Sequence, residues 1–77
     1  MKYTQYFLFT RQRQDRAIIK LQWIKEFIAN PVKTEFQKDG RIRKWGFITE
    51  VNKYLRVIML EDNETIHNAF FDRSFKE

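Results

Sequence analysis

Three runs of β-branched and aromatic residues dominate the second half of the chain. They span residues 41–48, 54–60 and 65–71, with polar turn residues between them. Because side chains two apart on a strand share a face, each run alternates between two environments. The pattern predicts a meander of three antiparallel strands.

The polar breaks predict how these strands align. If residues 52–53 and 63–64 form two-residue loops, Phe47 lies opposite Ile58, and Ile58 lies opposite Ala69. One face is then apolar and is expected to form the core with Ile48, Leu55, Val57, Met59, Ile66 and Phe70. The opposite face is basic and carries Arg41, Arg43, Trp45, Arg56, His67 and Arg73. A slip of one residue would exchange the faces of a whole strand.

The first half of the chain reads as a strand followed by a helix. Residues 3–10 are rich in aromatic residues and predict an edge strand, and residues 11–16 form a basic polar hinge. Apolar residues at helical spacing then predict a helix over 16–29, with Asp15 as its N-cap. Asn30-Pro31 ends this helix, because the residue before proline avoids the α region.

A further strand is predicted over residues 32–37, with a tight turn at 38–40 before the meander. The predicted order is one N-terminal strand, one helix and then four strands. This is an α+β fold in which the helix packs on a mostly antiparallel sheet. At 77 residues, the chain 1–77 is expected to form a single domain.

Charge narrows the range of partners. Fifteen Lys and Arg residues against ten Asp and Glu residues give a net charge of +5 and a pI near 9.8. This balance favours an anionic partner: nucleic acid first, an acidic protein second and an anionic membrane third. The plainer alternative is that a small protein is basic without any specific partner.

The residue inventory excludes several classes of site. The absence of Cys rules out disulfides and thiolate zinc sites, and one His with scattered carboxylates does not predict a metal site or any cofactor. The apolar run at residues 6–9 is too short for a signal peptide or a membrane span. We therefore expect a cytoplasmic protein with no membrane contact.

The chemistry that remains is that of His67 among arginines. Histidine can move a proton near neutral pH, and arginine binds phosphate oxygens with two parallel hydrogen bonds. Together they suit metal-free cleavage of RNA, with His67 as general acid or base and with Arg56 and Arg73 as stabilisers of the transition state. Residues predicted to bind RNA are Arg11, Arg13, Arg16, Arg41, Arg43, Lys44 and Trp45.

Each of these assignments has a structural alternative. His67 could be an ordinary strand histidine bonded to a neighbour, and Arg41 and Arg43 could form a solvated edge that opposes aggregation. Trp45 could belong to the core, and the basic stretch 11–16 could be a solvated helix entry.

The chain resembles a known family in several phrases that together cover most of its length. They are TRQRQDRA (10–17), NPV (30–32), DGRIRKW (39–45), YLRVIMLED (54–62) and ETIHNAFFDR (64–73). With the strand–helix–meander order, they resemble an uncharacterised bacterial subfamily of the small RelE/ParE-like toxins, a superfamily that also includes BrnT. The resemblance implies a RelE-like fold.

The resemblance also implies a function. It points to the toxin of a type II toxin–antitoxin pair, a metal-independent ribonuclease, encoded beside a small and acidic antitoxin with which it could form a hetero-oligomer. Assembly into a homo-oligomer is a further alternative. Two alternatives remain: a non-catalytic nucleic-acid-binding module, and a ParE-type toxin that acts on a protein target. The chain lacks the long C-terminal helix of some members.

Overall fold

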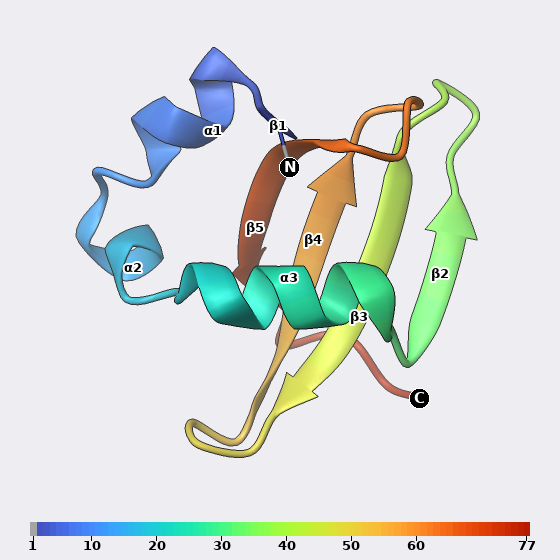
Figure 1. The fold of residues 1–77 in the computed structure, drawn as a ribbon. Coiled ribbons are helices and arrows are strands. Elements are labelled where there is room, and N and C mark those ends of the chain that lie inside the picture. The colour runs from blue at the N-terminus through green and yellow to red at the C-terminus, as the bar shows by residue number, and fades with distance from the viewer. Residues whose placement is uncertain (1) are drawn as a thin grey trace.

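A mixed sheet of five strands with three helices makes up residues 2–77, the part of the chain that the computed structural model describes (Figure 1). The helices are α1 (Gln5–Thr10), α2 (Gln14–Ala17) and α3 (Leu21–Ala29). The strands are β1 (Lys2–Tyr3), β2 (Lys33–Phe36), β3 (Ile42–Ile48), β4 (Lys53–Met59) and β5 (Thr65–Phe71). The α+β class is therefore confirmed, although three helices replace the single one predicted.

The strand order is β1-β5-β4-β3-β2, so β1 and β2 form the two edges of the sheet. The pair β1–β5 is parallel and the other three pairs are antiparallel, which confirms the meander and the mostly antiparallel sheet. Helix α3 crosses one face of the sheet, while α1 and α2 lie beside β5 (Figure 1). No helix within residues 2–77 is long and apolar enough to cross a lipid bilayer.

The predicted edge strand over residues 3–10 is wrong. Only Lys2–Tyr3 pair as a strand, and the aromatic residues that follow form α1. Thr4 starts this helix, because its hydroxyl accepts a hydrogen bond of 3.1 Å from the Phe7 N–H. Phe7 and Thr10, three residues apart, are buried together on one side of the helix. Their helical spacing explains why the strand alternation in this run is imperfect.

The predicted helix over 16–29 is interrupted. Residues 18–20 separate α2 from α3, and Arg13, not Asp15, occupies the N-cap position of α2. Ile19 lies in this break with only 1% of its surface exposed, so the core takes up its side chain from a non-helical position. The predicted end is confirmed, because α3 stops at Ala29, just before Asn30-Pro31.

The strand over residues 32–37 and the turn at 38–40 are also confirmed. Strand β2 covers Lys33–Phe36, and Gly40 then adopts a φ of +90°, a backbone conformation that glycine reaches without strain. Its N–H donates to the Gln37 carbonyl at 3.0 Å, which closes the turn.

The β3–β4 register differs from the prediction by four residues. Phe47 pairs with Tyr54 and not with Ile58, because the loop contains four residues, 49–52, with Asn52 at a φ of 54°. A shift by an even number of residues leaves every side chain on its predicted face. Ile48, Leu55, Val57 and Met59 are accordingly buried, as expected.

The β4–β5 register contains a β-bulge that the sequence analysis missed. Met59 pairs with Ile66, whereas Ile58 pairs with Asn68, so His67 is an extra residue in β5. Beyond the bulge, the two faces of β5 are exchanged relative to the prediction. Ala69 and Phe71 therefore pack toward the helices, and the assignment of Phe70 to the core is wrong.

The core lies between α3, α1 and the sheet face that they cover, and α3 packs tightly against β3 at Gly46. A side chain at this position would collide with the Phe27 ring of α3, so only glycine lets the helix lie against the strand. Phe27 itself is 7% exposed. The packing of α3 on the sheet thus depends on glycine, which has no Cβ, at position 46.

We expect Gly46→Ala to destabilise the fold by about 1–3 kcal/mol, because the new methyl group overpacks the helix–sheet contact. Chemical denaturation followed by circular dichroism measures the change. In the double variant Gly46→Ala/Phe27→Leu, the smaller side chain should recover part of the loss relative to Gly46→Ala alone. If the changes in the free energy of unfolding of the two single variants simply add in the double variant, the two residues are not in contact.

Candidate nucleic-acid interface

The sheet face opposite α3, called the outer face here, is organised by a buried carboxylate. Asp72 follows β5 directly, and its Oδ2 accepts hydrogen bonds from Arg56 Nη2 at 2.6 Å and from Arg56 Nε at 2.9 Å. The same oxygen accepts a bond of 2.9 Å from the indole N–H of Trp45. One carboxylate thus ties β3, β4 and the C-terminal tail together.

Hydrogen bonding keeps Asp72 ionised. Burial acts to raise its pKa, but the bonds from Trp45, Ser74 and Arg56 outweigh burial and hold the pKa of Asp72 well below its usual range. The tail also supplies Phe75, whose ring stacks on Trp45 with centroids 4.8 Å apart. Trp45 is only 3% exposed, so it is a buried residue of the outer face and not a free stacking platform.

Phe70 lies between two arginines on this face. The Arg16 and Arg56 guanidinium carbons are 5.2 Å and 5.1 Å from the centroid of its ring, within the range of cation–π attraction. Arg16 reaches β5 from α2, and its Nη1 donates to Asn68 Oδ1 at 2.6 Å. These contacts fix Arg16 in one orientation beside the end of β5.

A hollow of about 310 Å³ opens between α2 and the C-terminal end of β5, and we call it the cationic hollow. Its lining residues are Asp15, Arg16, Ile18, Lys53, Phe70, Phe71 and Arg73. Lys53 Nζ lies 4.9 Å from the Phe71 ring centroid. Lys53 and Arg73 are exposed and form no ion pair with any residue of 2–77. Together with Arg16 they place three cationic side chains beside aromatic rings, and Asp15 is the one acidic side chain in the lining.

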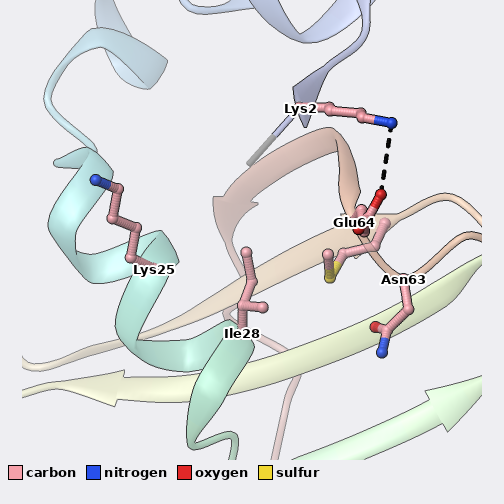
Figure 2. Close-up of a pocket in the computed structure, with 6 residues that line it drawn as sticks. Lys2, Lys25, Ile28, Asn63 and Glu64 are labelled. Atoms are coloured by element: carbon pink, nitrogen blue, oxygen red, sulfur yellow. Dashed lines mark ion pairs between the residues drawn. The ribbon is translucent and has the colours of Figure 1, made fainter.

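A second hollow, of about 290 Å³, lies on the helix-covered side (Figure 2). It is bounded by Lys25 and Ile28 of α3 and by Lys2 and Glu64 near the β4–β5 turn, and Met59 also lines it. Lys2 is paired with Glu64 at 3.5 Å, so its charge is partly neutralised. This hollow carries a smaller excess of positive charge than the cationic hollow and therefore attracts an anion less strongly.

His67 projects from the β5 bulge and contacts the N-terminal segment. Its Nδ1 lies 3.1 Å from the Thr4 hydroxyl, and its ring stacks on Tyr6 with centroids 4.9 Å apart. Burial, and secondly the positive charge of Arg41, lower the pKa of His67 from its ordinary value of 6.5. Both effects favour the neutral imidazole.

The predicted catalytic residues do not converge. His67 is the third residue of β5, whereas Arg73 lies two residues beyond the end of this strand, so the two are on the order of 15–20 Å apart along the chain direction. Arg56 pairs with Phe70 across the strands, and its guanidinium is held by the Asp72 carboxylate, which follows the end of β5. The structure instead brings Arg16, Arg56 and Arg73 together around Phe70 and the cationic hollow.

The remaining predicted RNA-binding residues are dispersed. Arg11 donates to the Ile19 carbonyl at 3.0 Å, Arg43 lies 3.6 Å from Glu35, and Arg13 and Arg41 are exposed. Lys44 is 8% exposed and lies on the helix-covered face of the sheet.

Lys44 has a clear structural contact in this position. Its Nζ donates a bond of 2.9 Å to the Ile28 carbonyl, in the last turn of α3. A lysine at this point stabilises the negative end of the helix dipole.

Two residues of this region, Asp72 and Lys53, were missed by the sequence analysis. Alternation along β5 could have found Asp72, because Asn68, Phe70 and Asp72 share the outer face once the bulge at His67 is known. Residues 2–77 contain no group of three or more His, Cys, Asp or Glu side chains able to hold a metal ion.

Asp72→Asn should lower the free energy of unfolding by about 1.5–3 kcal/mol at pH 7, because Arg56 loses a charged hydrogen-bond acceptor. The depressed pKa means that the unfolded chain takes up a proton more readily than the folded one. The stabilisation that the Asp72 carboxylate provides is therefore fully present above the pKa of the unfolded chain, about 3.8. It is lost as the pH falls below that value.

Urea denaturation between pH 2 and pH 7 measures both effects. The Asn variant should lose less stability than the wild type as the pH falls. It should retain some pH dependence, because hydrogen bonds from the Thr65 hydroxyl and from the Glu64 and Thr65 N–H groups lower the pKa of Asp62 to about 2. Parallel curves for the two proteins would show that the Asp72 carboxylate is not preferentially stabilised in the fold.

Comparison with family models, with curated proteins and with solved structures finds no match to this chain.

Proposed function

We propose that this protein binds the phosphate backbone of single-stranded RNA at the cationic hollow. The observation that carries the proposal is the grouping of Arg16, Lys53 and Arg73 beside two phenylalanine rings, with Asp15 as the one acidic side chain in the lining. Cations that contact phosphates, placed beside aromatic surfaces, are the usual elements of single-strand binding sites. The net charge of +5 supports the same class of partner.

The three cations have different roles in this proposal. Arg16 is fixed by Asn68 and by the Phe70 ring, so it offers donors in a set direction. Lys53 and Arg73 are exposed and unpaired within residues 2–77, so they are available to bind phosphate oxygens at the mouth of the hollow. The exposed parts of the Phe70 and Phe71 rings are suited to contact a ribose or an unstacked base.

The composition of the hollow favours binding over cleavage. His67 is not among its lining residues, and the one carboxylate there, Asp15, lies 3.7 Å from Arg16. Arginine and lysine stay protonated near neutral pH and are poor general bases. The hollow therefore offers charge for holding RNA but lacks the histidine on which the predicted cleavage depends.

The double variant Lys53→Ala/Arg73→Ala should weaken binding of a fluorescent oligouridine by about tenfold or more at moderate salt, since two charge-assisted contacts are lost. The slope of log affinity against log salt should also become shallower by roughly 0.7 for each phosphate contact removed. Fluorescence anisotropy over a salt series measures both quantities.

Lys25→Ala is the matched control for charge. Lys25 is an exposed lysine on α3, at the rim of the hollow in Figure 2, and its loss should reduce affinity only slightly through the net charge. If each single variant, Lys25→Ala, Lys53→Ala and Arg73→Ala, weakens binding to the same degree, RNA is attracted by overall charge and the cationic hollow is not its site.

A second candidate function is a metal-independent ribonuclease toxin with a RelE-like fold, neutralised by an acidic antitoxin. The observation that favours it is the position of His67 at a β-bulge, a feature that is common beside active sites. A neutral imidazole can accept a proton from a ribose 2′-hydroxyl, and Arg41 supplies positive charge near it. In this candidate function, Arg41 stabilises the transition state, which is the role predicted for Arg56 and Arg73. The sequence phrases that resemble the toxin family support the same function.

If this second function holds, His67→Gln should reduce RNA cleavage in the presence of a chelator by about 10²–10⁴-fold and should relieve growth arrest on expression. Glutamine keeps a polar group near Thr4, so circular dichroism and RNA affinity should match the wild type. Wild-type protein that cleaves no RNA, with or without ribosomes, and leaves growth unaffected would leave the binding function alone.

A further inference from the structure

Strand β2 is an open edge of the sheet that carries exposed apolar side chains. It pairs with β3 on one side and has no partner within residues 2–77 on the other. Phe36 is 78% exposed and Val32, just before the strand, is 49% exposed. Open strand edges with exposed apolar residues pair readily with another chain.

The β2–β3 ladder shows which backbone groups are free at this edge. The Gln37 N–H donates to the Arg41 carbonyl at 2.8 Å, and the register then places Glu35 opposite Arg43. Hydrogen-bonded pairs alternate along an antiparallel ladder, so residues 35 and 37 point their backbone groups toward β3. At the start of the strand, the Val32 N–H also points toward β3 and donates to the Trp45 carbonyl at 2.8 Å, so only the side chain of Val32 is available at the open edge. Thr34 and Phe36 consequently direct their N–H and carbonyl groups away from the sheet.

We propose that a second copy of this chain pairs with β2, antiparallel, with Thr34 opposite Thr34 of the second copy. In this register Val32 lies opposite Phe36 of the other copy, and Lys33 lies opposite Glu35. The strand is therefore self-complementary: apolar residues face apolar residues, opposite charges face each other, and threonine faces threonine. Such cross-strand pairs stabilise a sheet.

Backbone direction and symmetry select this register. Thr34 and Phe36 supply the outward hydrogen-bonding groups, so even-numbered residues must pair with even-numbered residues of the other copy. Moving the two-fold axis to residue 33 or residue 35 keeps this parity, but it places Lys33 opposite Lys33 or Glu35 opposite Glu35. Like charges directly opposite each other destabilise a strand pair.

The two-fold axis of this pair is perpendicular to the sheet, so the α3 helices of both copies lie on the same side. The contact is isologous and closed, with the same residues on both subunits. Edge pairing over about five residues is small beside a standard interface, which makes the dimer weak and dependent on concentration. Strand β2 and the cationic hollow lie at opposite sides of the sheet, so the dimer and RNA binding can be tested independently.

Sedimentation equilibrium over a wide concentration range, without RNA, tests the dimer, and Thr34→Pro is the first variant. Proline removes an outward N–H that the monomer leaves unpaired, so the variant should fold like the wild type. It should raise the dimer dissociation constant by tenfold or more, because both symmetry-related Thr34–Thr34 bonds are lost.

Charge reversal tests the register. Lys33→Glu and Glu35→Lys should each weaken self-association by roughly tenfold, since each places like charges opposite each other twice. A mixture of the two single variants should form heterodimers about as tightly as the wild type forms dimers, because every charged pair is again of opposite sign. Their monomeric folds should be unaffected, since the Lys33 and Glu35 side chains are 50% and 45% exposed and their ion pairs within the chain contribute little.

Three results would overturn the proposal. One is a wild-type protein that stays monomeric at millimolar concentration. Another is dimerisation that Thr34→Pro leaves unchanged, which would place the interface elsewhere. The third is a mixture of Lys33→Glu and Glu35→Lys variants that associates no better than either variant alone, which would reject this register.

Discussion

The outer face of this protein depends on one inserted residue in β5. Because His67 has no partner in β4, the side chains that follow it are shifted to the faces opposite those of a regular ladder. Ala69 and Phe71 pack toward the helices, and Phe70 and then Asp72 point outward. Without the bulge, Asp72 would face the core, and Arg56 would lack its carboxylate.

Asp72 in turn determines which cations remain available. Arg56 is neutralised by this carboxylate and covered in part by aromatic rings, so it acts as a structural residue. Its ion pair is stabilised by the indole N–H of Trp45, which satisfies a buried carboxylate that would otherwise be costly. The positive charge left for a ligand then lies at the end of β5, on Lys53 and Arg73, beside the fixed guanidinium of Arg16.

The two edges of the sheet are closed in different ways. The parallel strand β1 and helix α1 cover β5, and Thr4 links this segment to the bulge through His67. The opposite edge, β2, has no such cover within residues 2–77 and exposes Phe36. A 77-residue chain has few elements with which to cover a five-stranded sheet, which makes an open edge a natural site for association.

The sequence by itself determined the meander, the end of α3 at Asn30-Pro31 and most of the core, because alternation and proline chemistry act over a few neighbouring residues. It also indicated a basic protein with outward arginines. Only the tertiary structure decided the helical state of residues 5–10, the break at Ile19, the loop lengths and the bulge at His67. These features depend on packing between segments far apart in the chain. The composition of the candidate site followed from them, since one inserted residue reverses the faces of a strand and so changes which charged groups meet.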